Sequence, residues 1–140
     1  MMSKHLGAAY EAQFAADALK KGLHVLEPKG DYLPYDFIVH GATGSYKVQV
    51  KGTGAKMRRG QRKTDYYKIV AGNRQKGDSR GKVKISAEEA DLLAAYMAPS
   101  GVWYFIPIPK IESVSMYFSP DNQVSQAKYE IWKEAWNLFR

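Results

Sequence analysis

Four residues in the first part of the sequence have types and positions that could support hydrolysis of a charged substrate. They are Glu11, Asp36, Gln49 and Lys51. The carboxylates and the amide oxygen could hold a hard divalent cation, because such cations prefer oxygen ligands. The lysine could orient a water molecule or, as the neutral amine, deprotonate it, and its ammonium form could stabilise the negative charge that develops during phosphodiester hydrolysis. Whether these four side chains can lie close together depends on the helix or strand that carries each of them.

Glu11 lies in an Ala-rich and Leu-rich segment, residues 5–21, which we predict to be a helix ended by Gly22. Its neighbours three and four residues away are small or apolar, and no local cation pairs with it. Such a carboxylate either points outward by chance or reaches a distant cation or a metal. Helix periodicity favours neither alternative. Asp17 has two lysines at helical spacing and is typical of an exposed helix acid.

Asp36 is unusual because strands are depleted in Asp, yet it lies in a segment of strand composition, residues 35–39. Residues 46–50 form a second such segment, and the glycines between the two predict a β-hairpin. If the turn is centred between Ala42 and Thr43, Asp36 lies opposite Gln49, and Lys51 lies two residues further along the same polar face. On spacing alone, a simple ion pair between Lys51 and Asp36 is slightly favoured over a catalytic site.

The remaining segments predict the other parts of the fold. Short strands are expected at residues 24–26, 66–70, 102–106 and 114–118, a helix from the capping-box sequence Ser86-Ala87-Glu88-Glu89 to about Met97, and a C-terminal helix with one aromatic stripe of Tyr129, Trp132, Trp136 and Phe139. We assign this stripe to the core in preference to a subunit contact. The order of elements predicts an α+β or mixed α/β fold in which helices cover a sheet. The length of 140 residues fits one domain spanning residues 1–140.

The basic residues are concentrated in the middle of the chain. The net charge is +7, but residues 51–84 contain twelve Lys or Arg and two acids, so the rest of the chain is slightly acidic. This distribution is typical of a surface that binds a polyanion, and a solubilising surface is the less favoured alternative. We expect two basic DNA-binding loops, at about residues 52–64 and 73–84. Their candidate contacts are Lys56, Arg58, Arg59, Arg62, Lys63, Arg74, Lys76 and Arg80.

Other classes of site are disfavoured by the composition. The chain has no cysteine, which excludes disulfides, thiolate zinc sites and a cysteine nucleophile. The three histidines lack zinc-site spacing, and the sequence Gly52-Thr53-Gly54 does not continue as a phosphate-binding loop, so we expect no nucleotide cofactor. Those glycines are interpreted as allowing the basic loop to approach a DNA backbone. No segment is apolar enough to span a membrane, and we expect a soluble cytoplasmic protein.

Three sequence stretches resemble the PD-(D/E)XK nuclease superfamily. They are Gly7-Ala8-Ala9-Tyr10-Glu11 on the predicted first helix, Tyr35-Asp36-Phe37-Ile38-Val39 on a strand and Gln49-Val50-Lys51-Gly52 on the next strand. The sequence is most similar to the intron-encoded homing endonucleases of that superfamily that carry a Gln-x-Lys variant. It is also similar to archaeal-type Holliday junction resolvases.

The resemblance implies a restriction-endonuclease-like mixed sheet and a DNA endonuclease that uses Mg²⁺, for which Mn²⁺ can substitute. Asp36, Gln49, the Val50 carbonyl and Glu11 would hold the metal, and Lys51 would be catalytic. Gln49 stands where the family pattern has a carboxylate. Three functions therefore remain: a site-specific homing or phage-type enzyme on double-stranded DNA, a Holliday junction resolvase with the same site, and a DNA-binding module with a decayed site. Cleavage of both strands implies a homodimer or homotetramer.

Overall fold

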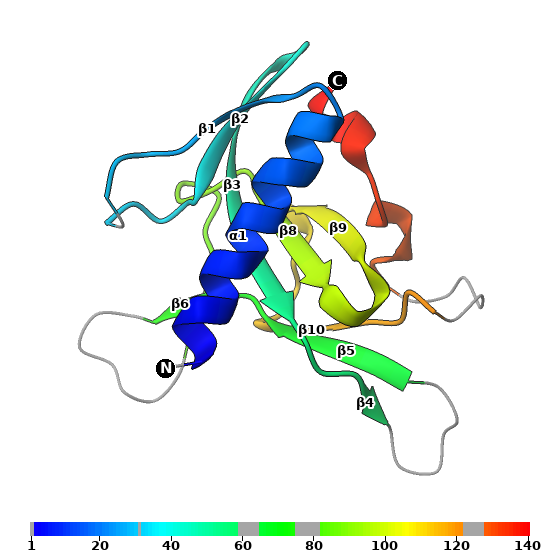
Figure 1. The fold of residues 1–140 in the computed structure, drawn as a ribbon. Coiled ribbons are helices and arrows are strands. Elements are labelled where there is room, and N and C mark those ends of the chain that lie inside the picture. Colours follow the sequence, from blue (N-terminus) through cyan, green and yellow to red (C-terminus); the bar gives the residue numbers. More distant parts are fainter. Residues whose placement is uncertain (1, 31, 59–64, 75–81, 122–127) are drawn as a thin grey trace.

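The computed structural model describes residues 2–30, 32–58, 65–74, 82–121 and 128–140. One long helix, α1 (Met2–Lys20), lies across a sheet (Figure 1). It ends as predicted: the Gly22 backbone N–H donates to the Leu19 carbonyl, and Gly22 adopts a left-handed conformation with φ of 79°. Phe14 and Ala18 are fully buried on the sheet side of α1. No described helix is long and apolar enough to cross a membrane.

The main sheet has five strands in the order β1-β2-β3-β8-β9. They are β1 (His24–Leu26), β2 (Phe37–Gly41), β3 (Gly44–Thr53), β8 (Leu92–Met97) and β9 (Val102–Pro107). The pair β3–β8 is parallel and the other neighbouring pairs are antiparallel. The predicted mixed sheet and the predicted hairpin are therefore confirmed. The parallel pair requires a long crossover, and this crossover contains the basic part of the sequence.

The crossover forms smaller strands on the side of the sheet away from α1. A three-stranded sheet contains β4 (Met57–Arg58), β5 (Asp65–Val70) and β10 (Ser115–Phe118), while β6 (Gly72–Arg74) pairs with β7 (Lys82–Lys84). The sheet thus has a core on each face. Val48, Val50 and Phe105 pack against α1, whereas Leu93 and Tyr104 pack against β5 and β10.

The predicted helix over residues 86–97 is wrong. Part of the capping box forms, because the Ser86 N–H donates to Glu89 Oε1 at 2.9 Å, but only a turn follows it. Asp91 then joins the strand ladder, donating its N–H to the Lys47 carbonyl at 2.8 Å. Residues 92–97 form the buried strand β8 between β3 and β9. A short apolar run is compatible with a buried strand and with a buried helix, so the sequence pattern could not distinguish the two.

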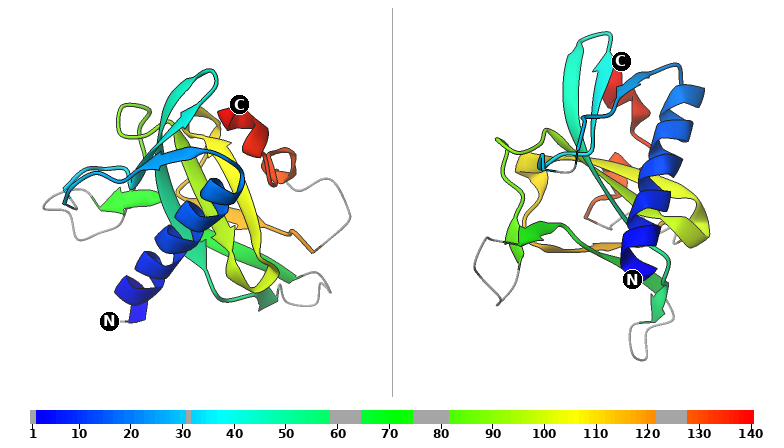
Figure 2. Two further views of the ribbon diagram at one scale, coloured as in Figure 1. Left: turned by 45° about the horizontal axis from the view of Figure 1, so that its top comes forward. Right: turned by 60° about the vertical axis from the view of Figure 1, so that its left-hand side comes forward.

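The predicted C-terminal helix is also wrong. Two short 3₁₀ helices occupy this region, η3 (Glu130–Trp132) and η4 (Trp136–Phe139), beside the yellow strands β8 and β9 in Figure 2. Tyr129, Trp136 and Phe139 are core residues, as predicted, whereas Trp132 is only partly buried against the core, and the four do not form one stripe. Tyr129 lies in the core under β5 and β10, and Trp136 and Phe139 lie in the core under α1.

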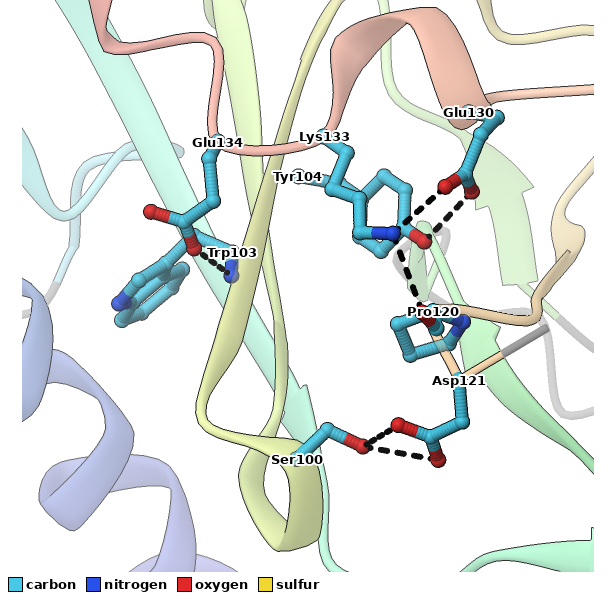
Figure 3. Close-up of polar contacts among 8 residues, drawn as sticks. All are labelled: Ser100, Trp103, Tyr104, Pro120, Asp121, Glu130, Lys133 and Glu134. Atoms are coloured by element: carbon cyan, nitrogen blue, oxygen red, sulfur yellow. Dashed lines mark hydrogen bonds and ion pairs between the residues drawn. The ribbon is translucent and has the colours of Figure 1, made fainter. Parts of the chain in front are cut away.

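Glu134 explains why the C-terminal segment changes direction. Its φ of 49° is left-handed, which interrupts any helix at this point. The Glu134 N–H donates to the Trp103 carbonyl at 2.7 Å, and Glu134 Oε2 accepts the Trp103 N–H at 2.6 Å (Figure 3). Lys133 also forms a β-bridge with Tyr104. These contacts with β9 cover the edge of the sheet, so strand-like pairing has replaced the predicted helix.

Candidate active site

Asp36 lies where the β2–β3 hairpin opens. Phe37 pairs with Val48 and Gly41 with Gly44, which confirms the predicted register. The ladder is irregular one residue earlier, because the Asp36 N–H donates to the Val48 carbonyl at 2.9 Å. Beyond this point β3 is bonded by the Asp36 side chain and not by a strand backbone, because Asp36 Oδ2 accepts the Val50 N–H at 2.7 Å. This contact fixes the carboxylate beside β3, opposite the stretch that contains Gln49.

The alternation along β3 separates apolar from polar side chains, as predicted. Val48 and Val50 are buried under α1. Gln49 and Lys51 point to the other face, where their parallel partners on β8 are Leu93 and Ala95. Gln49 is 8% exposed and is the one buried polar side chain among the residues that the structure describes. The predicted polar face is therefore not a solvated surface at Gln49.

Glu11 approaches this place from α1 and is half-buried. Burial raises the pKa of its carboxyl, and the negative charges of Asp36 and Glu27 raise it further, while Lys51 opposes them. Of the two alternatives left by the sequence, the structure favours a carboxylate that reaches a cation distant in sequence, because the Lys51 charge acts on Glu11 and both residues line one cleft. Glu27 was not singled out from the sequence, because its position just after β1 carried no signal.

A cleft of about 450 Å³ brings the predicted residues together. Glu11, Asp36, Gln49 and Lys51 all line it, and so does Val50. Burial raises the pKa of Asp36 as well, although the Val50 N–H and the Lys51 charge act in the opposite direction. Two half-buried acids and one cation thus share a cleft that is open to solvent on one side. Perturbed carboxyl groups in a cleft are typical of a functional site.

Tyr10 lines the same cleft and was not predicted. Its ring lies against the backbone of β3 so closely that a Cβ at Gly52 would stand 2.4 Å from Tyr10 Cδ2, and a Cβ at Gly54 would stand 3.3 Å from the Tyr10 hydroxyl. The sequence interpretation of these glycines concerned DNA. The structure provides another reason, since Gly52 allows α1 to cross β3 at close range between Glu11 and Lys51. A glycine inside a strand was the signal that could have revealed this contact.

Asp17 differs from the prediction of an ordinary exposed acid. Its Oδ2 accepts the indole N–H of Trp103 at 2.9 Å, and its Oδ1 accepts a hydrogen bond from Gln13 at 3.0 Å. Asp17 therefore attaches α1 to β9. This role depends on a residue 86 positions away, which helix spacing does not reveal.

The donor set of the cleft fits a hard divalent cation. The Asp36 carboxylate lies beside β3, and Glu11 supplies a second carboxylate from α1. The N–H and the carbonyl of a strand residue point to the same edge, so the Val50 carbonyl points toward the Asp36 side. Gln49 Oε1 is buried and accepts no hydrogen bond within the described residues, although Gln49 has other contacts. All of these donors are oxygens, which Mg²⁺ and Mn²⁺ prefer.

The predicted DNA contacts are described only in part. Lys56 forms an ion pair with Asp121, in which Lys56 Nζ lies 3.0 Å from Asp121 Oδ2. The backbones of Arg58 and Arg74 lie in β4 and β6. The other five predicted contacts lie outside the described residues: Arg59, Arg62, Lys63, Lys76 and Arg80.

Comparison with known proteins agrees with the geometry. A family model described as PD-(D/E)XK endonuclease matches residues 1–139. The structure is also similar to that of a bacterial homing endonuclease, I-Ssp6803I, with a TM-score of 0.74 and 20% sequence identity over 99% of this chain and 93% of that chain. At this identity the similarity concerns the fold. None of the curated proteins compared with the chain matches it. Since the family model matches nearly the whole sequence, the chain belongs to the PD-(D/E)XK endonuclease family.

Proposed function

We propose that the protein is a divalent-metal-dependent endonuclease that hydrolyses phosphodiester bonds in double-stranded DNA. The observation that carries the proposal is the cleft in which Glu11, Asp36, Gln49 and Lys51 meet. Membership of the endonuclease family supports the reaction class. The proposal treats residues 1–140 as one nuclease domain whose four cleft residues form the active site.

In the proposed mechanism, Asp36, Gln49, the Val50 carbonyl and Glu11 would hold the metal, Mg²⁺ or Mn²⁺. When bound, the metal supplies Lewis acidity toward the phosphate. Lys51 would orient the attacking water as the ammonium ion or, as the neutral amine, would take its proton. In either case the resulting ammonium charge would stabilise the negative charge that develops on the phosphorus centre. The Val50 N–H holds Asp36 in place through the 2.7 Å hydrogen bond. The hydrophobic core beneath Val50 keeps these groups in a fixed arrangement.

The substrate class is proposed from charge. The basic segment, residues 51–84, begins with Lys51 in the last part of β3, so a polyanion bound along it would come close to the cleft that Lys51 lines. The structural neighbour is a homing endonuclease, and this supports a site-specific enzyme in preference to a junction resolvase. Cutting both strands with one site per chain would require a homodimer or homotetramer.

A cleavage assay tests the proposal. Wild-type protein with Mg²⁺ or Mn²⁺ should cut supercoiled and linear duplexes from a mixed DNA panel. Asp36→Ala should abolish cutting while leaving DNA binding largely intact. Lys47→Ala is a matched control, because Lys47 lies on the same face of β3 but bonds to the Glu88 carbonyl, outside the cleft.

The alternatives give different results in the same assay. Preferential cutting of a four-way junction offered beside the duplex would identify a resolvase. DNA binding without cleavage under any metal would identify a binding module, the alternative that Gln49 favours because it replaces the family carboxylate. Absence of both binding and cleavage on the whole panel would contradict the proposed function.

A further inference from the structure

Lys56 takes part in a polar network at the root of the basic segment. We infer that Asp121, Ser100 and Tyr67 hold Lys56 in a latch that sets the direction of the basic arm relative to the cleft. The basic arm is defined here as the paired strands β4 (Met57–Arg58) and β5 (Asp65–Val70). Lys56 is then a positioning residue and not a phosphate contact. The inference rests on the proposed function, in which this arm binds DNA.

The contacts of the latch come from four separate parts of the chain. Lys56 Nζ lies 3.0 Å from Asp121 Oδ2 and 5.8 Å from the centre of the Tyr67 ring. The Ser100 hydroxyl lies 3.0 Å and 3.2 Å from the two carboxylate oxygens of Asp121 and points at them in Figure 3. The Tyr67 and Ser100 hydroxyl oxygens are 2.8 Å apart.

The proton directions in this network are fixed by the carboxylate. Asp121 can only accept, so the Ser100 hydroxyl donates to it. The Tyr67 hydroxyl must then donate to Ser100. Lys56 completes the arrangement by placing its positive charge on Asp121 and over the Tyr67 ring. Each polar group therefore has a complementary partner, which is typical of a network that specifies one geometry.

The position of the latch gives it control over the arm. Lys56 directly precedes β4, and Tyr67 lies on β5, so both strands of the arm are held near their roots. Tyr67 is 1% exposed and belongs to the core, while Ser100 lies in η1 (Ala98–Ser100) at the end of β8. Since β3 ends at Thr53, only two residues separate the cleft strand from Lys56. The latch thus joins the arm to the same sheet that carries the active site.

The side chains of Lys56 and Asp121 are 40% and 51% exposed. An isolated pair with this exposure contributes little to stability. The network therefore biases the direction of the arm without locking it. For this reason we expect a moderate effect on DNA binding and no loss of the fold.

The sign of the Asp121→Asn effect separates a latch from a phosphate contact. If Lys56 is held for positioning, Asp121→Asn should weaken DNA binding by about threefold to tenfold, the range for a partly exposed network. If Lys56 instead contacts phosphate, removing the carboxylate would free a cation and remove a repulsive charge, so binding would tighten. Tighter binding by Asp121→Asn overturns the inference.

The Lys56 variants provide a second readout. Lys56→Gln should weaken binding as much as Asp121→Asn does, and the double variant should be no worse than either single variant. The slope of log K against log salt should stay at the wild-type value, whereas loss of a phosphate contact would reduce it by about 0.9. Lys56→Arg, which can keep the ion pair, should bind like wild type. Lys110→Gln, an exposed lysine of η2 (Ile108–Lys110), is the control for charge loss.

A measurement without DNA distinguishes failure of the latch from failure of the proposed function. Amide hydrogen exchange at Met57 and Tyr66, which pair across the arm, should be faster in Asp121→Asn than in wild type. Unchanged exchange overturns the latch. A wild-type protein that neither binds nor cleaves DNA overturns the proposed function and the DNA-positioning role, and faster exchange in the variant would then show a tether without that role.

Discussion

Two polar clusters of the molecule contain similar side chains in different environments. In the cluster beside β9, Lys133 Nζ donates to Glu130 Oε1 at 2.7 Å and to the Pro120 carbonyl at 3.0 Å, and the Tyr104 hydroxyl donates to Glu130 Oε2 at 3.0 Å (Figure 3). In the cleft, Lys51 acts on Asp36 and Glu11 through charge, and both acids have raised pKa values.

The two clusters differ in whether their charged groups line a space that a ligand can enter. The groups beside β9 use their hydrogen-bonding capacity within the protein, so the cluster holds the C-terminal segment against the sheet. The cleft acids are partly buried and have raised pKa values, and they line a space that can admit a ligand. A lysine and an acid close together therefore do not identify a site by themselves. The cleft differs from the cluster beside β9 in having a space that can admit a ligand.

The largest expected effect comes from Lys51→Met. Cleavage should fall by about 100-fold or more, because the variant loses both a proton-transfer group and a transition-state charge. The melting temperature should fall modestly, because Asp36 and Glu11 lose the nearby positive charge that favours their ionised forms, so the rate is compared per folded molecule. Rate and melting temperature are measured on the same preparation. Retention of near-wild-type cleavage would remove Lys51 from the mechanism.

Lys133→Met should affect stability more than cleavage. Cleavage per folded molecule should stay near wild type, and the free energy of unfolding should fall by about 1–3 kcal/mol, because Glu130 and the Pro120 carbonyl each lose a donor. Denaturant unfolding gives this value. A loss of cleavage without a loss of stability would show that the two clusters are not functionally distinct.

Gly52→Ala tests the geometry that brings α1 to the cleft. The new methyl group would meet the Tyr10 ring, so α1 must shift and Glu11 with it. We expect kcat to fall about tenfold, as small displacements of catalytic groups do, with a smaller change in KM. Tyr10→Leu in the same chain should recover part of the rate by making room. Full activity of Gly52→Ala alone would show that this close approach is unimportant.

Gln49→Glu restores the carboxylate of the family pattern. The added charge should lower the Mg²⁺ concentration for half-maximal cleavage by about tenfold, since ligand charge controls affinity for hard cations. Without metal the variant should be less stable, because it places a buried acid in a cleft that already contains Asp36 and Glu11. A magnesium titration and a melting curve in chelator measure both effects. An unchanged magnesium dependence would place Gln49 outside the metal site.

The smallest expected effect concerns pH. The folded-state pKa of Asp36 is raised above the ordinary 3.8, first because of burial, so the native protein binds this proton more tightly than the unfolded chain does. Metal-free wild type should therefore lose stability as pH rises through the window between the ordinary and the raised pKa. Asp36→Asn still accepts the Val50 N–H but does not titrate. Its melting temperature relative to wild type should rise across that window and level off above it.

The sequence was most informative over the first 53 residues. Strand alternation and the glycine turn gave the hairpin register, and register alone placed Asp36 beside the stretch containing Gln49 and Lys51. The resemblance then assigned roles that alternation could not. These features are local, since each depends on residues within one helix or one hairpin.

The errors occurred where contacts are distant in sequence. The capping-box turn at Ser86 did not lead to a helix, because Asp91 and β8 pair with β3 more than forty residues earlier. Trp136 and Phe139 have helical spacing, but Glu134 bonds to Trp103 on β9 and redirects the segment. Long-range strand pairing overrode local propensity in both cases.

The sequence by itself determined the types of candidate catalytic group, the helix that carries Glu11 and the hairpin that aligns Asp36 with Gln49 and Lys51, because short-range periodicity and turn chemistry specify these features. Only the tertiary structure decided that Glu11 faces that hairpin, that Tyr10 requires Gly52, and that Lys56 is held by Asp121. Each of these depends on packing between elements remote in sequence, and the free energy of such packing is absent from any local pattern.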